Sequence, residues 1–357
     1  MGLRILYDGD SGVVSMKQLK EFVDHLFLLR GLSPLDTCQL SLLELDDNSD
    51  IVGRIHLWIR HVLMCRVQAL SLSISWNIDC WTTRFYPDDL LLVSQYLKRL
   101  EVSKLQLNRS FVDFSSCPAL EVLEIKDCDI LDLDKISSES LKSLSITHGC
   151  DFSDDHRIHL YAPNLVSLRL EVFGGRAPIL ERMPSLVKAL VKIKDNECDC
   201  CCVTDSGDCL SEVQSLVLIA DTRLCIFRRD LKCCPIFSNL KTLLLNEYCC
   251  LPADFSALTC FLQHTPVLEK LTLQLFCKGP NSKVQMKGNP DPTERSNAIS
   301  QHLKIVEVKC EVVDDKVLNV LKFLNKLGIF LFDMRGKKTS YEEIPKIIKF
   351  SEYMGNY

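Results

Sequence analysis

The chain has 357 residues, of which 47% are hydrophobic and 25% are charged, as in a folded globular protein and unlike a disordered one. Its 42 basic and 47 acidic residues give a formal charge of −5, which argues against a nucleic-acid partner because such proteins normally carry a basic excess. No apolar run approaches the roughly 18 residues that a membrane-spanning helix needs, so we expect no membrane partner either.

The cysteines and the first residues bear on the cellular location. The 19 cysteines are odd in number and several are adjacent, as in Cys200-Cys201-Cys202, which favours reduced thiols over a disulfide framework. The first residues show no basic stretch followed by an apolar one, so we expect no secretory signal. Together these features predict a cytoplasmic or nuclear protein.

Residues 15–30 have the pattern of an amphipathic helix. Ser15 is a candidate N-cap and Gly31 a candidate C-terminal stop. The apolar stripe expected to face the core consists of Leu19, Phe22, Val23, Leu26 and Leu29.

An internal repeat then runs through most of the chain. The segment from Leu120 to Ile130 fits the pattern L-x-x-L-x-L-x-x-N/C-x-L at every fixed position, with Cys128 at the N/C position. Ten segments carry the shorter core L-x-x-L-x-L or a close variant of it. They begin at Val67, Leu97, Leu120, Leu141, Leu165, Leu186, Val213, Leu240, Leu268 and Leu303. From Leu120 to Leu268 the copies start 21 to 28 residues apart, which is typical of leucine-rich repeats.

The repeat predicts an α/β leucine-rich-repeat solenoid. Within each copy the apolar residues alternate along a short strand, so the leucines point inward, where each contributes roughly 1.5–3 kcal/mol on full burial. One repeat cannot cover its own apolar face, and neighbours must therefore stack. We expect parallel strands on the concave face and irregular helices and loops on the convex face.

These features divide the chain into four predicted segments. Residues 1–60 form an N-terminal helical cap and pre-repeat segment that covers the open end of the first repeat. Residues 61–277 are the leucine-rich repeats. Residues 278–335 are a C-terminal capping region, which starts with a polar loop and contains an amphipathic helix at 314–327. Residues 336–357 are a charged, loosely held tail.

The candidate partner-binding residues alternate with the leucines and are therefore expected on the concave face. They are Arg99, Glu101, Glu124, Lys126, Arg169, Glu171, Lys188, Lys192 and Lys270. Both signs of charge are present, which suits an unknown protein or small-ligand partner. The alternative, that these are ordinary solvated strand faces, stays open for each residue taken alone.

No motif in the chain predicts catalysis or a cofactor. The cysteines from Cys198 to Cys209 include one C-x-x-C spacing, but no second pair follows at a distance usual for zinc, so a loop with reduced thiols is favoured over a metal site. Neither a glycine-rich phosphate loop nor a dinucleotide fingerprint is present. We therefore expect a binding protein with no catalytic, cofactor-binding or metal-binding residues.

Several phrases resemble a plant protein family. They include Phe22-Val-Asp-His-Leu-Phe-Leu-Leu-Arg-Gly-Leu-Ser-Pro-Leu-Asp36, Phe114-Ser-Ser-Cys-Pro-Ala-Leu-Glu-Val-Leu123 and Ala162-Pro-Asn-Leu-Val-Ser-Leu168. Leu262-Gln-His-Thr-Pro-Val-Leu-Glu-Lys-Leu-Thr-Leu273 and His302-Leu-Lys-Ile-Val-Glu-Val308 follow. Together they resemble the plant F-box/leucine-rich-repeat proteins that carry an FBD region at the C-terminus, and the segment 278–335 corresponds to that region.

The resemblance implies a role in substrate recognition for a cullin-RING ubiquitin ligase. In such proteins an F-box that opens with Leu-Pro-x-Asp docks on a Skp adaptor. That motif does not precede Phe22, and Leu251-Pro-Ala-Asp254 is an isolated match between repeats. We therefore expect the recognition part without adaptor docking. Two alternatives stay open, a free-standing leucine-rich-repeat scaffold unrelated to ubiquitination and a metal- or redox-responsive protein that uses the cysteines from Cys198 to Cys209.

Overall fold

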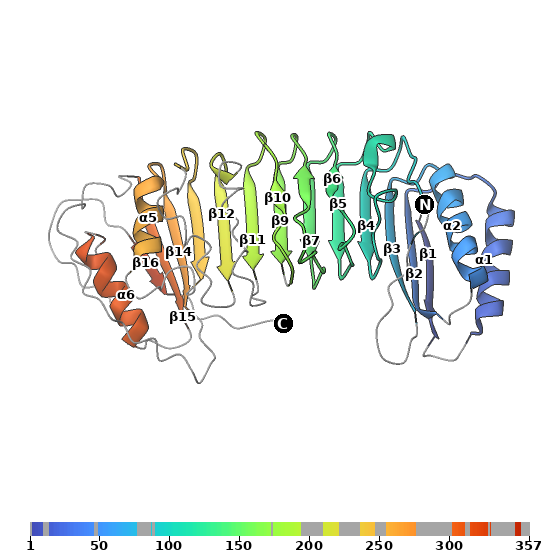
Figure 1. Ribbon diagram of the computed structural model, residues 1–357, viewed down its shortest axis with the longest axis horizontal. Helices are drawn as coiled ribbons and strands as arrows, with labels where there is room; N and C mark the ends of the chain where they lie inside the picture. The colour runs from blue at the N-terminus through green and yellow to red at the C-terminus, as the bar shows by residue number, and fades with distance from the viewer. Residues whose placement is uncertain are drawn as a thin grey trace. The chain divides into compact units, whose positions relative to one another are not determined.

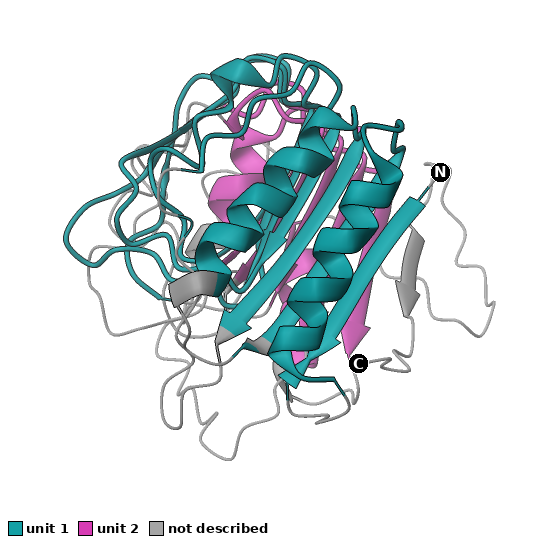
Figure 2. Cartoon of the chain, turned by 90° about the vertical axis from the view of Figure 1, so that its right-hand side faces the viewer, with its two compact units in different colours: residues 1–185, 196–201 teal, residues 186–195, 202–357 magenta. Residues whose placement is uncertain are grey.

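In the computed structural model, the chain divides into two compact units, which are described separately. Unit 1 comprises residues 1–185 and 196–201, and unit 2 comprises residues 186–195 and 202–357 (Figure 2). The structure describes residues 2–9, 14–45, 49–76, 87, 90–172, 174–193, 210–220, 236–246, 255–275, 302–310, 315–327, 329 and 347–350. The division falls inside the repeat segment 61–277, and the four segment limits given above remain predictions.

Unit 1 is built on parallel strands that follow one another in chain order (Figure 1). They are β1 (Gly2–Asp8), β2 (Thr37–Leu45), β3 (Ala69–Trp76), β4 (Arg99–Ser103), β5 (Val122–Lys126), β7 (Ser143–Thr147) and β9 (Ser167–Val172). Each strand pairs with the next without an intervening strand. This is the stacking that the leucine pattern predicts.

The repeat leucines lie in register beneath the strands. Leu100, Leu123 and Leu144 pair across β4, β5 and β7, and each is at most 2% exposed. Backbone hydrogen bonds join the same neighbouring repeats. The carbonyl of Lys98 accepts hydrogen bonds from the amides of both Glu121 and Val122, at 2.9 and 3.0 Å. Burial and backbone bonding therefore fix the same register.

The chain leaves these strands through a turn that also repeats. Lys104, Asp127 and His148 each lie seven residues after the first leucine of their copy, and all three have a positive φ, between 48° and 60°. Cys128 and Cys150 follow the turns and are fully buried, so these small side chains fill space there. Cys249 and Cys277, which the sequence places at comparable positions, lie outside the described residues.

Short elements line the other side of the coils in unit 1. They are the 3-10 helix η2 (Phe114–Ser116) and the strands β6 (Lys135–Ser137), β8 (His159–Tyr161) and β10 (Ile179–Leu180). The three strands pair in parallel as a second, smaller sheet. They give the side opposite the main strands the irregular character expected for a convex face.

The N-terminal segment corrects one prediction. Residues 1–60 were expected to form a helical cap over the end of the first repeat, but β1 and β2 extend the strand row, and α1 (Met16–Arg30) and α2 (Ser49–Met64) connect successive strands along one face (Figures 1 and 2). The pattern Leu35-x-x-Cys38-x-Leu40 explains this result, because Cys38 takes the place of a repeat leucine and is 2% exposed.

Helix α1 begins where the sequence predicts, but its buried face differs. Ser15 and Gln18 form a reciprocal capping box at its start. The buried residues are Leu19, Val23 and Phe27, whereas Phe22 and Leu29 from the predicted stripe are 62% and 88% exposed. The centroid of the Phe27 ring lies 4.7 Å from that of the His61 ring in α2. Phe27, on the buried face of α1, therefore packs against α2.

Unit 2 repeats the arrangement. Its parallel strands, in spatial order, are β11 (Lys188–Ile193), β12 (Ser215–Ala220), β13 (Thr242–Asn246), β14 (Lys270–Leu275), β15 (Ile305–Cys310) and β16 (Ile347–Phe350). Its helices are α5 (Ser256–His264) and α6 (Asp315–Lys326), and the second confirms the helix predicted at 314–327. Strand β16 lies within the segment 336–357, where the sequence analysis expected a loose tail.

Candidate functional site

We define the open face of each unit as the side of its parallel strands that carries the residues alternating with the buried leucines. It corresponds to the face that the sequence analysis expects to be concave. All nine candidate residues lie on it, six in unit 1 on β4, β5 and β9 and three in unit 2 on β11 and β14. All nine thus alternate with buried residues along their strands, while the concave shape of this face and their role in binding remain predictions.

Four of these residues form one ion network across β4 and β5. The Lys126 ammonium lies 2.7 Å from a carboxylate oxygen of Glu101 and 2.9 Å from one of Glu124. The Arg99 guanidinium donates to the other oxygen of Glu124, at 3.1 Å. Like charges directly opposite each other destabilise a sheet, and here the cations offset the repulsion between Glu101 and Glu124, which are register partners.

The network raises the pKa of Lys126. Partial burial favours the neutral amine, but the hydrogen bonds and charges of Glu101 and Glu124 outweigh that effect and raise the pKa of the ammonium above its ordinary value. Lys126 therefore stays charged across the physiological range and presents a fixed cation on the open face.

Strand β9 carries a second ion pair, formed within one strand. Two guanidinium nitrogens of Arg169, Nε and Nη2, donate to the same oxygen of Glu171, at 3.1 and 2.7 Å. Glu171 is only 7% exposed, so the arginine stabilises a carboxylate that has little access to water. Between this pair and the network, β7 presents the short side chain of Ser145, which pairs in register with Glu124 and Arg169.

On the open face of unit 2 the described cations outnumber the anions. Lys270 lies 2.9 Å from Glu307 on the neighbouring strand β15, and Lys309 lies 3.8 Å from the same carboxylate. The sequence analysis did not select Glu307 or Lys309. The signal was present, because Leu303-x-x-Val306-x-Val308 places Glu307 at the repeat position that Glu124 occupies in its own copy.

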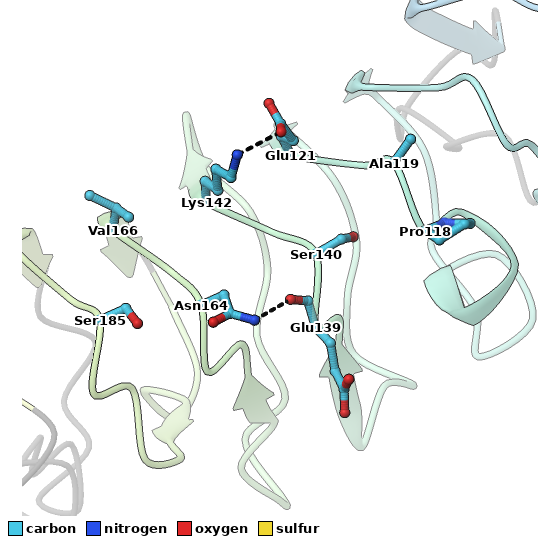
Figure 3. A pocket seen from close by; sticks show the side chains of 9 residues that line it. All are labelled: Pro118, Ala119, Glu121, Glu139, Ser140, Lys142, Asn164, Val166 and Ser185. Carbon is cyan, nitrogen blue, oxygen red and sulfur yellow. Dashed lines mark hydrogen bonds and ion pairs between the residues drawn. The ribbon is translucent and has the colours of Figure 1, made fainter.

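A shallow pocket of about 430 Å³ lies where the strands of unit 1 begin (Figure 3). Glu121 and Lys142 form an ion pair of 2.7 Å at its rim, and Asn164 donates to the carbonyl of Glu139 at 2.8 Å. The hydrogen bond and charge of Lys142 lower the pKa of Glu121. Ser140 already donates to the carbonyl of Leu120, so this lining offers polar contacts and no hydroxyl paired with a base.

A second hollow, of about 650 Å³, lies between α1 and α2. Asp24 accepts hydrogen bonds from Arg54 and, at 2.9 Å, from the indole of Trp58. Leu28 and Leu57 line the same hollow and are 79% and 63% exposed. The sequence analysis did not identify this hollow, because the helical periodicity of α1 alone does not reveal how two helices sit together.

The structure bears on the expectations about metal binding and membrane spans only through its described residues. The cysteines from Cys198 to Cys209 are among those that the structure does not describe, so zinc binding there stays untested. Within the described ranges, no cluster of three or more histidine, cysteine or acidic side chains could hold a metal ion. In the same ranges, no helix is both long enough and apolar enough to cross a membrane.

Comparisons with known proteins add two matches. The family model described as "At1g61320/AtMIF1, LRR domain" matches residues 58–316. A curated protein of Arabidopsis thaliana, F-box/FBD/LRR-repeat protein At5g22660, is 29% identical over 275 residues, which cover 65% of this chain. The aligned part spans 60% of the length of that relative. No solved structure gives a significant match.

Proposed function

The chain belongs to the At1g61320/AtMIF1 leucine-rich-repeat domain family, and from this premise we propose that its open face binds a protein partner. The family match confirms the expected α/β leucine-rich-repeat fold. The similarity to an F-box/FBD/LRR-repeat protein confirms the expected plant family resemblance. Repeats of this kind act as protein-interaction modules through the extended surface that their stacked strands create.

The ion network on β4 and β5 is the observation that carries the proposal. Arg99, Glu101, Glu124 and Lys126 hold one another in place before any partner arrives. A surface that is already ordered loses less conformational entropy on binding than one with mobile side chains. Charged groups of both signs in fixed positions also favour a polypeptide with complementary charges over a uniformly charged polymer.

We infer that the chain recognises its partner for ubiquitination, in the manner of a substrate-recognition subunit of a cullin-RING ubiquitin ligase. We expect it to act in the cytoplasm or nucleus. The similarity to the F-box/FBD/LRR-repeat protein supports this role. The buried thiols of Cys128 and Cys150, which form no disulfide within the described part of the chain, support a reducing compartment. Because residues 1–357 lack a complete F-box motif, we expect the purified chain not to bind a Skp adaptor tightly. The alternative is a leucine-rich-repeat scaffold unrelated to ubiquitination.

Quantitative affinity capture from plant extract tests both levels of the proposal. The wild-type chain is compared with R99E/K126E, which reverses two cations of the open face, and with K17E/K20E on α1, which makes the same change of charge elsewhere in unit 1. We expect proteins that the wild type and the α1 variant retain and that the open-face variant loses. Equal recovery by all three would refute binding through the open face of unit 1, where the ion network lies.

The ligase role makes a further demand on the captured proteins. Those that depend on the open face should carry ubiquitin remnants and accumulate when the proteasome is inhibited. Recovery of the same proteins without ubiquitin and without accumulation would favour the scaffold.

A further inference from the structure

The open faces of the two units differ in charge. On β4, β5, β7 and β9 of unit 1, three cations are balanced by three anions, and each cation is paired with an anion. On β11 to β15 of unit 2, the described open-face positions carry four lysines, Lys188, Lys192, Lys270 and Lys309, but a single glutamate, Glu307. The described open-face strand positions of unit 2 therefore carry an excess of positive charge, with Lys270 and Lys309 both near Glu307, whereas those of unit 1 are balanced.

An apolar row crosses the same face of unit 2. Leu190, Val217 and Leu244 are register partners on β11, β12 and β13, and all three are half-buried. The corresponding positions in unit 1 hold Glu124, Ser145 and Arg169. Since adjacent strands lie about 4.8 Å apart, the row is about 10 Å long, enough for two aliphatic side chains of a bound segment.

Lysines lie at both ends of this row. Lys188 and Lys192 flank Leu190 on the same strand, separated from each other by about 13 Å at the rise of an extended chain. Lys270 lies on β14, the strand after Leu244. The arrangement is an aliphatic floor with ammonium groups around it.

We propose that the open face of unit 2 binds an acidic segment of a partner protein, in which aliphatic side chains contact Leu190, Val217 and Leu244 and carboxylates face the surrounding lysines. This inference rests on the proposed function and names the chemistry of the partner. Nucleic acid fits less well, since the open-face positions of β11 to β15 include neither the aromatic residues on which bases stack nor arginine.

Fluorescence anisotropy with defined peptides tests the proposal on the full chain. The probe is a labelled peptide of about twelve residues in which leucine alternates with glutamate, and the matched probe has lysine in place of every glutamate. We expect the acidic peptide to bind at least about tenfold more tightly, because each opposite-charge pair contributes a factor of a few. Equal binding of the two peptides, or tighter binding of labelled oligothymidylate, would overturn the proposal.

Two variants locate the binding. K188E/K192E should weaken the acidic peptide by about tenfold, whereas K322E/K326E, which makes the same charge change on exposed positions of α6, should leave it within about twofold. If K188E/K192E did not fold, the comparison of the two peptides on the wild type would still decide. If the wild-type chain bound both peptides equally while capture from extract still depended on Arg99 and Lys126, this inference would be refuted. The proposed function would still stand.

Discussion

Glu101 and Glu124 lie directly opposite each other on β4 and β5, and the ammonium of Lys126 lies within 3 Å of both carboxylates. Two like charges in register would by themselves favour slippage of the strands. The repeat pattern forces them together, since each occupies the same position of its own copy. By pairing with both carboxylates, Lys126 offsets their mutual repulsion and keeps them ordered on the open face.

Replacing Lys126 with methionine tests this relationship. K126M keeps the aliphatic stem but leaves Glu101 and Glu124 opposed, so we expect a loss of roughly 1 kcal/mol in the free energy of unfolding. Urea denaturation at pH 7 measures it. K142M is the matched control, because among the described residues Lys142 forms one ion pair, with Glu121 on the exposed rim, so its loss should cost less. An equal cost for the two variants would contradict a bridging role.

The difference in stability between wild type and K126M should depend on pH. The pKa of Lys126 is raised in the folded chain, so its contribution is fully present below the ordinary lysine pKa of about 10.4 and is lost as the pH rises through the higher folded value. The stability gap between wild type and K126M should therefore hold from pH 7 to 9 and narrow above about pH 10.5. A gap that widens in that range would refute the assignment.

The leucines beneath the strands should dominate stability. Leu144 is 2% exposed and lies in the shared core of β5, β7 and β9, so L144A should lower the free energy of unfolding by about 2–5 kcal/mol. Its neighbour Ser145 faces the other side of the strand, and S145A should stay within about 0.5 kcal/mol of wild type. Similar effects from both changes would mean that the two faces are not distinct.

The turn after β4 predicts an unusual tolerance for glycine. Lys104 has a φ of 60°, a conformation that costs a side chain about 1–2 kcal/mol and costs glycine nothing. K104G should be neutral or stabilising by up to about 1 kcal/mol, whereas K104V should be destabilising. K98G, at a position without a positive φ, provides the control and should be destabilising. Thermal unfolding of the three variants ranks them.

Burial should protect the thiol of Cys38 from alkylation. Burial, together with the nearby Cys65 and only partly offset by Arg30, raises the pKa of this thiol to about 12. Since the thiolate is the reactive form, iodoacetamide at pH 8 should leave the Cys38 peptide unmodified in the native protein and label it fully in urea. Mass spectrometry reads both states, and rapid labelling of the native chain would contradict the burial.

The repeat pattern predicted the strands and their open faces because burial of leucine is periodic and local. It missed Leu35-x-x-Cys38-x-Leu40, since a cysteine can fill a core position without matching a leucine template. The helical pattern of residues 15–30 placed Phe22 and Leu29 on the buried side of α1, because helical periodicity does not say which neighbour a helix contacts. Ion pairs such as Arg99 with Glu124 depend on register between copies, which a single copy does not encode.

Carbodiimide cross-linking tests the stacking of the coils most directly, because it joins only a lysine and a carboxylate that touch. The structure places Lys126 against Glu101 and Lys142 against Glu121, each at 2.7 Å, and Lys304 against Glu269 at 3.3 Å, each pair joining one repeat to the repeat before it. Mass spectrometry of the digested monomer should recover these three links. Links that instead join these lysines to carboxylates two or more repeats away would contradict the stacked arrangement on which the open face depends.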